Sequence, residues 1–353
     1  MRKRENTVPG AARSGPKNKK KAAGNIIDIM AGAKAVLAPM SGITDVPFRI
    51  MARKFGCKVA FTEMIDVNGI VYKNRKTLRM LDRCEETGPL GVQIVGSEED
   101  RILHAAKVCE EKGFDVLDLN AGCPAPKVVK GGKGAALLKD PVKLARIVRL
   151  LRDALSVPVT VKIRSGWDDE SLNYLEVAKA VSSEGASAIC IHSRTKNQMY
   201  KGKANWDIIG EVKRSVDIPV FASGNIFSAH DVKDVIASTG CDGVFVARGA
   251  LGHPWIFTEI NELFSGDISA GSTSFDDIKD VILEHYSCSA SFYGEERTFK
   301  KMYKHLSWYL KRFKNLNEIM KVYLKIKDMN EFRAFIGRLC LDERNWLYLV
   351  RSM

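Results

Sequence analysis

The stretch Phe114-Asp115-Val116-Leu117-Asp118-Leu119-Asn120-Ala121-Gly122-Cys123-Pro124 joins a short apolar run to a loop rich in glycine and proline. The apolar run is short enough for a buried strand, and residues 140–152 beyond the loop have a helical pattern. Cys123 is therefore expected at the C-terminal end of a strand, where the active sites of α/β proteins are found. A lone cysteine is more often an ordinary small residue, so a functional role for Cys123 depends on what surrounds it.

The same alternation of apolar runs and amphipathic segments extends along the chain in both directions. Eight short apolar or β-branched runs are expected to form strands, at residues 35–39, 59–63, 91–94, 116–120, 159–163, 188–192, 220–223 and 243–247. Segments of helical length lie between them, such as 98–112, 171–184 and 229–239. Eight β/α repeats predict an α/β protein with a closed (β/α)8 TIM barrel. A doubly wound open sheet is the alternative, but no G-x-G-x-x-G opens the first repeat.

The composition fits a barrel with a second, smaller module. The chain has 353 residues, of which 45% are apolar, and it exceeds the about 250 residues of a typical barrel. Its eight cysteines are scattered without a C-x-x-C pair or a metal-like spacing with the six histidines, which predicts a reducing, cytoplasmic location and no structural metal. No long apolar run occurs, and none follows the basic N-terminus, so neither a membrane span nor a secretory signal is expected.

The net charge of +13 is concentrated in two places. Residues 1–23 hold eight Lys or Arg against one Glu, in a stretch expected to be disordered. Residues 297–327 hold ten Lys or Arg, opposed only by Glu318. A basic tail alone could serve solubility, but two basic clusters around a neutral body favour a polyanionic partner.

Four regions follow from these patterns. We expect a basic disordered extension at 1–24, the barrel at 25–264, a Gly/Ser/Asp-rich linker at 265–275 and a smaller all-helical domain at 276–353. In that domain the helix over 297–314 has one apolar face, formed by Phe299, Met302, Tyr303, Leu306, Leu310 and Phe313. The opposite face is basic, with Arg297, Lys300, Lys301, Lys304, Lys311 and Lys314. Such a stripe is usually a solvated face, but its single sign favours contact with a nucleic-acid backbone.

Nearly every predicted strand brings a polar or special residue to the same rim of the barrel. These residues are Pro39, Met40, Ser41, Glu63, Gln93, Asn120, Lys162, Arg164, His192, Arg194, Ser223, Gly224, Asn225, Ala247 and Arg248. In TIM barrels the loops after the seventh and eighth strands commonly bind phosphate, and here those loops contain glycines and Arg248. Lys162 lies in the barrel interior, where a cation is costly unless it faces an electron-rich ring. Lys127, Lys130 and Lys133 give the Cys123 loop a charge that also suits a phosphate-rich ligand.

Six motifs contain most of these rim residues. They are Ala38-Pro39-Met40-Ser41-Gly42-Ile43-Thr44-Asp45-Val46-Pro47-Phe48-Arg49, Val92-Gln93-Ile94, Leu119-Asn120-Ala121-Gly122-Cys123-Pro124, Lys162-Ile163-Arg164, Ile191-His192-Ser193-Arg194-Thr195 and Arg248-Gly249-Ala250-Leu251-Gly252-His253-Pro254-Trp255-Ile256-Phe257. Together they closely resemble the motifs of the tRNA-dihydrouridine synthases, most of all the bacterial B-type branch. The resemblance covers residues 35–324 in family order. No single motif is specific, but the set is.

The resemblance implies an FMN-binding barrel that reduces the C5–C6 double bond of D-arm uridines in tRNA, with NADPH as the electron donor. By position, the flavin ring would be held by Pro39, Met40, Ser41, Gln93, Lys162 and His192. The ribityl phosphate would be held by Ser223, Gly224, Asn225, Ala247 and Arg248, and Cys123 would donate the proton. Contact with tRNA is expected from Asn120, Lys127, Lys130, Arg164, Arg194, Lys300, Lys304 and Lys311. The sequence departs from the family pattern at Ser223-Gly224-Asn225, at Ala247 and at His253, which affects only details of the phosphate contacts.

The chemistry of a thiol supports the role of Cys123 as an acid. Hydride addition to C6 of uracil leaves an enolate-like centre at C5, which then needs a proton. A thiol with a pKa of about 8.5 is mostly protonated at pH 7 yet gives up its proton readily. Two other interpretations stay open: an FMN barrel acting on a free small molecule, like dihydroorotate dehydrogenase, and a non-catalytic RNA-binding barrel.

Overall fold

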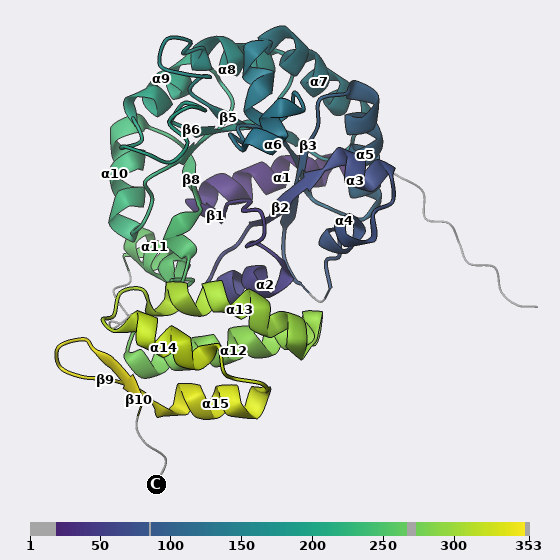
Figure 1. Cartoon of the computed structure of the whole chain (residues 1–353). Helices are drawn as coiled ribbons and strands as arrows, with labels where there is room; N and C mark the ends of the chain where they lie inside the picture. The colour runs from purple at the N-terminus through teal and green to yellow at the C-terminus, as the bar shows by residue number, and fades with distance from the viewer. Residues whose placement is uncertain (1–18, 85, 267–272, 350–353) are drawn as a thin grey trace, which may run out of the picture.

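Eight parallel strands close into a barrel in the computed structural model, which describes residues 19–84, 86–266 and 273–349 (Figure 1). The strands are β1 (Ala35–Leu37), β2 (Ala60–Asp66), β3 (Leu90–Val95), β4 (Val116–Ala121), β5 (Val159–Arg164), β6 (Ala188–His192), β7 (Val220–Ser223) and β8 (Gly243–Val246). They follow one another in chain order, and β1 closes the barrel against β8 with Ala35 opposite Val244. The predicted TIM barrel is confirmed, and each strand lies within a few residues of its predicted position.

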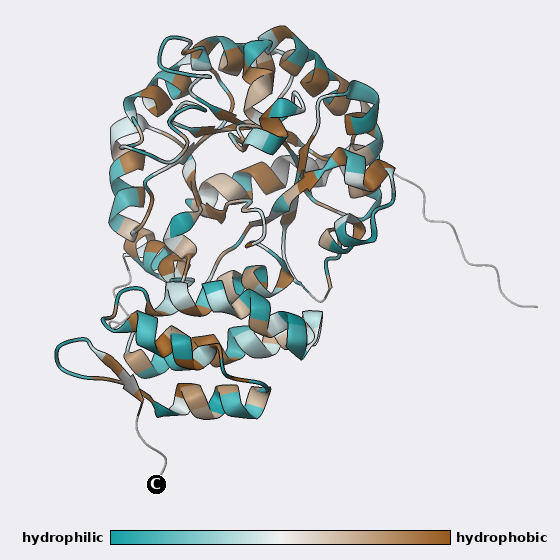
Figure 2. Ribbon diagram, in the orientation of Figure 1, coloured by the Kyte–Doolittle hydropathy of each residue, from teal (hydrophilic) through white to brown (hydrophobic). Residues whose placement is uncertain are grey.

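A ring of helices covers the outside of the barrel (Figure 1). The ring and its connecting turns comprise α2 (Val46–Lys54), α3 (Val67–Val71), α4 (Arg75–Met80), α5 (Glu99–Glu111), α6 (Pro126–Lys130), η1 (Gly134–Lys139), α7 (Pro141–Ala154), α8 (Tyr174–Ser183), α9 (Asp207–Ser215), α10 (Ala229–Thr239), η2 (Arg248–Ala250) and α11 (Ile256–Ser265). In α7 the Asp140 side chain caps the first turn by accepting from the Lys143 amide, and Pro141 occupies the first helical position. The helix buries Leu144, Ile147, Val148 and Leu151, one amphipathic face. Figure 2 shows hydrophilic residues on the outer faces of the ring.

One end of the barrel is closed by α1 (Lys19–Gly32), which crosses it (Figure 1). Ile26, Ile27 and Met30 are buried there in one cluster with residues in or directly before the strands, namely Val36, Val59, Phe61, Val116, Ala188, Cys190, Phe221 and Phe245. Several of these lie at or near the N-terminal ends of their strands, so α1 leaves the C-terminal ends available for a site. The boundary predicted after residue 24 falls inside α1, and residues 1–18 of the predicted extension lie outside the described residues.

The C-terminal part of the chain forms a smaller domain with a core of its own. It contains α12 (Phe275–Tyr293), α13 (Glu295–Leu310), α14 (Leu316–Tyr323), α15 (Met329–Arg338) and an antiparallel pair, β9 (Leu339–Leu341) and β10 (Leu347–Leu349). The pair departs from the prediction of a domain that is helical throughout, because two strands of three residues each are too short to show a period. The predicted linker falls between α11 and α12, and its residues 267–272 lie outside the described residues.

The two domains are packed together rather than joined only by a chain. Met51 of α2 and Trp255, both from the barrel, are buried in the core of the helical domain. Gly252, with a φ of +67°, lies so close to α13 that a Cβ there would be 2.2 Å from the backbone carbon of Trp308. The helical domain is therefore held in a fixed position against the end of the barrel that carries the β1–α2 loop.

Candidate active site

A cavity of about 620 Å³ opens at the C-terminal ends of the strands. Its walls include residues from all eight strands or the loops that follow them. All eleven residues predicted to bind the cofactor line it: Pro39, Met40, Ser41, Gln93, Lys162, His192, Ser223, Gly224, Asn225, Ala247 and Arg248. Cys123 lines it as well, together with Asn120, Lys127 and Arg164 from the set predicted to bind tRNA.

Two residues that line the cavity, Gln93 and Asn120, belong to a buried hydrogen-bonded chain centred on Asp118. The amide nitrogen of Gln93 donates to Asp118 Oδ2 at 2.6 Å, and Thr160 Oγ1 donates to Asp118 Oδ1 at 2.6 Å. Asn120 Nδ2 in turn donates to Gln93 Oε1 at 2.8 Å. Burial raises the pKa of Asp118, and these two hydrogen bonds act in the opposite direction. The chain fixes the amide of Gln93, and sequence reasoning missed the part played by Asp118 and Thr160.

The loop that carries Cys123 is held by side chains that were predicted to contact tRNA. Asn120 Oδ1 accepts from the amides of Gly122 at 3.1 Å and Cys123 at 2.8 Å. Arg164 is 2% exposed and donates from Nε to the Gly122 carbonyl at 2.7 Å. Gly134, with a φ of +60°, packs against the Cys123 backbone, so that an added Cβ would lie 2.8 Å from the Cys123 carbonyl oxygen. These contacts fix the backbone from which the thiol projects.

The surroundings of the Cys123 thiol favour its protonated form. Burial raises its pKa, while a hydrogen bond with the Ala125 backbone and the charge of Arg164 act in the opposite direction. Nucleophilic cysteines instead have a depressed pKa beside a base or a cation. A half-buried thiol with a raised pKa suits a proton donor.

The loops after β7 and β8 form a cradle with little side-chain bulk. Gly224 has a φ of +110°, which an L-residue rarely adopts. A Cβ on Gly249 would lie 2.4 Å from the Ile226 carbonyl oxygen, so the backbone passes closer than other residues allow. The Arg248 guanidinium carbon lies 5.3 Å from the ring centre of Tyr200 and 5.4 Å from that of Phe227. Within the part of the chain that the structure describes, Arg248 has no salt bridge and can pair with an anionic ligand.

His192 and Arg194 act as a pair inside the protein. Arg194 Nη1 lies 3.2 Å from His192 Nε2, which must accept because a guanidinium can only donate. Burial, and then the charge of Lys162, lowers the pKa of His192 well below its usual value, so the ring is neutral. Arg194 is 1% exposed and also donates to the carbonyls of Lys201 and Gly202. This burial argues against the predicted contact of Arg194 with tRNA and makes it a positioning residue.

The lysines predicted to contact tRNA fall into two groups. Lys127 and Lys130 on α6 are exposed, and so are Lys300 and Lys311 on or next to α13. Lys304 is partly buried, because α13 turns this face toward the barrel, and its Nζ donates to the Gly42 carbonyl. The expected single stripe is therefore divided between solvent and the domain interface.

The mouth of the cavity carries apolar side chains that sequence reasoning missed. Met199, Tyr200 and Phe227 are exposed by 40%, 52% and 46%, although each lines the cavity. The Tyr200 ring lies 5.5 Å from the guanidinium carbon of Arg164. These residues occur in loops, where periodicity gives no signal, and exposed rings beside a cavity suit the stacking of a base.

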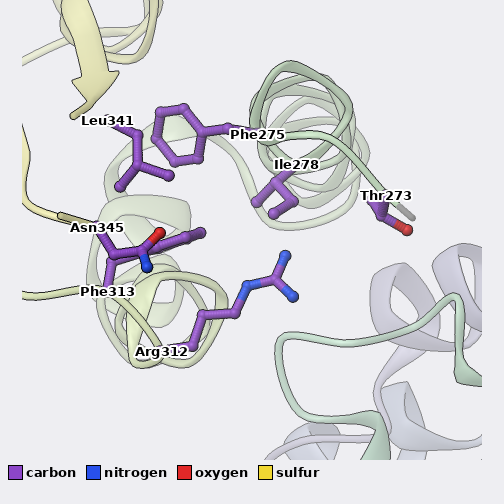
Figure 3. A pocket seen from close by; sticks show the side chains of 7 residues that line it. All are labelled: Thr273, Phe275, Ile278, Arg312, Phe313, Leu341 and Asn345. Atoms are coloured by element: carbon purple, nitrogen blue, oxygen red, sulfur yellow. The ribbon is translucent and has the colours of Figure 1, made fainter. Parts of the chain in front are cut away.

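A second cavity, of about 310 Å³, lies within the helical domain. Its lining residues are Thr273, Phe275, Ile278, Arg312, Phe313, Leu341 and Asn345. Figure 3 shows Arg312 extending its guanidinium toward Ile278. None of the predicted site residues lines this cavity. Over residues 19–84, 86–266 and 273–349, no cluster of three or more His, Cys, Asp or Glu is arranged to hold a metal ion, and no helix has both the length and the apolar character needed to cross a membrane.

Comparisons with known proteins agree along most of the chain. The profile of a family described as dihydrouridine synthase (Dus) matches residues 36–342. A tRNA-dihydrouridine synthase B from Vibrio vulnificus is 38% identical over 290 residues, which cover 82% of this chain and 90% of that protein. A tRNA-dihydrouridine synthase B from Pseudomonas aeruginosa is 34% identical over 312 residues, covering 88% of this chain and 94% of that protein.

Two solved structures resemble the chain in fold alone. Histamine dehydrogenase from Rhizobium sp. 4-9 superposes with a TM-score of 0.51 at 13% identity, over 72% of this chain and 49% of that one. The amine oxidase of 6-hydroxypseudooxynicotine from Pseudomonas geniculata N1 gives 0.52 at 13% identity, over 66% and 47%. The chain spans about half the length of these two proteins.

Proposed function

Because the chain belongs to the dihydrouridine synthase family, we propose that it reduces the C5–C6 double bond of uridines in the D arm of tRNA, with Cys123 as the proton donor. It is a flavin-dependent oxidoreductase that modifies tRNA. The observation that carries the proposed role of Cys123 is a half-buried thiol of raised pKa on a loop that Asn120 and Arg164 hold in place. This loop borders a cavity whose wall includes glycines and cationic side chains. A tRNA substrate also supports a cytoplasmic location.

The residues around the cavity fit FMN. Its volume of about 620 Å³ lies within the range of cofactor sites, which is about 300 to 1,000 Å³. Gly224 lines the cavity without a side chain, and Gly249 lets the loop after β8 pack closely on the loop after β7. Arg248, which has no salt bridge within the described residues, would supply a positive charge for a phosphate beside Gly224. Met40, Gln93, Lys162 and His192 would contact the ring. Bound FMN, reduced by NADPH, would supply the hydride that adds to C6 of the uracil.

The protein's own groups would complete the reaction at C5. Cys123 Sγ gives its proton to C5, so that one hydride and one proton saturate the double bond and a thiolate remains. The Arg164 cation stabilises that thiolate until solvent returns a proton. Asn120 holds the backbone from which the thiol projects, because its side chain accepts from the Cys123 amide and cannot move without breaking its bond to Gln93. Because Nε2 of the neutral His192 accepts from Arg194, Nδ1 carries the proton and can donate to the ligand without adding a further charge.

An FMN barrel acting on a free small molecule is the competing function. It would share the cavity, but it gives no reason for the exposed lysines Lys127, Lys130, Lys300 and Lys311. The test is to incubate the purified protein with FMN, NADPH and an unmodified tRNA transcript and to map dihydrouridine along the RNA. Position-specific dihydrouridine in the D arm is expected. A yellow protein that oxidises NADPH but leaves the transcript unchanged would overturn the proposal in favour of the small-molecule enzyme.

A further inference from the structure

The helical domain reaches the loop that begins the cavity. Gly42 follows Pro39, Met40 and Ser41, three of the cavity-lining residues, and has a φ of +73°. Its amide donates to Glu63 Oε1, and its carbonyl accepts from Lys304 Nζ. Gly42 is thus held by a carboxylate from β2 and by an ammonium group from α13, which belongs to the other domain.

The far end of the same loop is held from the same helices. Asp45 Oδ1 caps α2 by accepting from the Phe48 amide at 3.2 Å. Asp45 Oδ2 accepts from Tyr293 Oη at 2.8 Å and from Lys301 Nζ at 3.0 Å. Both residues come from the helical domain, so residues 42–45 are fixed between the two domains.

The contacts of Lys304 with Gly42, and of Tyr293 and Lys301 with Asp45, form a clamp on residues 42–45. Movement of this clamp would be transmitted directly to the cavity wall. The Met40 amide donates to Thr44 Oγ1 at 2.9 Å, and the Thr44 amide donates to the Met40 carbonyl at 3.0 Å. Arg49 Nη1 donates to the Thr44 carbonyl at 2.9 Å. Residues 40–44 therefore form one closed turn, and a shift of Gly42 moves Met40 with it.

The charges at the clamp depend on one another. Burial, and then the nearby Asp45, raises the pKa of Glu63, while Lys301 and Lys304 lower it. Burial, and then Lys301, lowers the pKa of Lys304, while Asp45 and Glu63 raise it. His285 on α12 and His305 on α13 are also buried, and burial keeps both rings neutral. Neither histidine therefore provides a positive charge that could replace that of Lys304. Without Lys304, two carboxylates would face a single ammonium group, and Glu63 would become a weaker acceptor for Gly42.

We propose that Lys304 is a positioning residue for the flavin, through which the helical domain sets the conformation of the Pro39–Gly42 turn. The inference rests on the proposed function, because it assumes that this turn contacts FMN. It assigns Lys304 a role different from that of Lys300, whose side chain is 77% exposed one turn earlier on the same helix.

The experiment compares three single losses of charge on α13. Lys304→Met removes the contact with Gly42, Lys300→Met removes an exposed charge, and Lys301→Met removes the pairing with Asp45 without touching Gly42. The dissociation constant of FMN is measured by flavin fluorescence, with neither tRNA nor NADPH present, and thermal unfolding of the apo protein is followed in parallel. We expect Lys304→Met to weaken FMN binding about tenfold or more, the effect of a lost charge-assisted hydrogen bond, and Lys300→Met to leave it unchanged. Lys301→Met should mainly lower the unfolding temperature of the apo protein. Its effect on the dissociation constant of FMN should be smaller than that of Lys304→Met.

A second variant keeps the proposal open to refutation if Lys304→Met does not fold. Glu63→Gln retains an oxygen for the Gly42 amide but removes the counter-charge of Lys304, so it should weaken FMN binding less, in the same direction. Unchanged FMN affinity in Lys304→Met, or in Glu63→Gln where only that variant folds, would overturn the inference. A tenfold loss in all three lysine variants would also overturn it, since it would indicate a general loss of the interface. Wild-type protein that binds no FMN would instead refute the proposed flavin site.

Discussion

At the level of single residues, the chemistry depends on how tightly a common side chain is held. Cys123 resembles the other cysteines in sequence, yet its amide bonds to Asn120 and its loop to Arg164, which together place the thiol beside the cavity. Its raised pKa keeps the proton on sulfur at neutral pH. Burial raises the pKa of Cys109 as well, to about 12, but that thiol lies in the core. Position, rather than protonation state, therefore distinguishes Cys123 from a structural cysteine.

Replacing Cys123 with Ala should separate proton transfer from the other steps. We expect FMN binding, flavin reduction by NADPH and tRNA binding to persist, because none of them uses the thiol. The rate of dihydrouridine formation should fall by about 10² to 10⁴, the range for a lost general acid. Cys123→Ser should recover little, since a hydroxyl gives up its proton far less readily. Single-turnover formation of dihydrouridine measures the effect, and turnover near the wild-type value would show that the proton comes from elsewhere.

The sequence predicted which residues line the cavity better than it predicted what each side chain does. Cavity residues follow strand ends, so all eleven predicted cofactor contacts meet there. Arg194 also follows a strand end, yet loop residues 201 and 202 bury it and take up its donors. Asp118 lies within a strand and has no motif of its own; its role comes from Gln93 and Thr160 on the two neighbouring strands. Such cross-strand partners depend on register, which no single-strand pattern reveals.

At the level of elements, α13 serves two partners with different faces. Its buried residues Met302, Leu306 and Leu310 pack into the helical domain, while Lys301 and Lys304 meet the barrel. Arg297, Lys300, Lys311 and Lys314 of the predicted basic face are exposed and remain available to solvent or RNA. Helical periodicity predicted an apolar and a basic face, but it could not show that part of the basic face meets a second domain.

Reversing the exposed charges on α13 should weaken tRNA binding without affecting the flavin. For the double variant Lys300→Glu/Lys311→Glu we expect a higher KM for tRNA and a flatter dependence of binding on salt, because fewer counterions are released. NADPH oxidation without RNA should be unchanged. The matched control is Lys107→Glu/Lys233→Glu, which makes the same change in net charge at exposed sites on α5 and α10. Equal effects of the two variants on KM would mean that α13 contributes only to the overall charge.

The buried histidines between α12 and α13 should make stability fall in acid. Burial lowers the pKa of His285 to about 4 and that of His305 well below its usual value, so both are neutral when folded. The unfolded chain binds protons below a pKa of about 6.5, so stability is retained above that pH and is lost as the pH falls toward 4. His285 alone should cost about 2 kcal/mol between pH 7 and pH 5.

Urea unfolding at both pH values measures this loss, and the His285→Phe variant should lose less stability than the wild type over the same interval. Replacement of the exposed His104 by Phe serves as the control and should not alter the pH dependence. The same loss in His285→Phe as in the wild type would contradict the assignment to this histidine.

At the level of the whole molecule, the repeats predicted the barrel but not what closes and covers it. Eight short apolar runs in even alternation with helices leave few other topologies, because each strand is buried on both faces. The plug formed by Ile26, Ile27 and Met30 could not be predicted, since α1 belongs to no β/α repeat. The position of the helical domain on the barrel could not be predicted either, because it depends on the close approach of the Gly252 and Trp308 backbones.

That close approach gives a prediction about the whole molecule. Ala at position 252 would have a φ of +67° and would also place its Cβ 2.2 Å from the Trp308 backbone, which cannot rotate out of the way. Gly240→Ala is the matched control, because Gly240 has a φ of +69° but no atom within 4 Å of the added Cβ. We expect Gly240→Ala to cost about 1 to 2 kcal/mol from backbone strain and Gly252→Ala to cost more than about 4 kcal/mol or to separate the domains. Urea unfolding followed by flavin fluorescence for the barrel and by tryptophan fluorescence for the interface distinguishes these outcomes. If the two variants lose the same stability, the contact with Trp308 adjusts freely, and the helical domain is not fixed against the barrel in the way that the clamp on Gly42 requires.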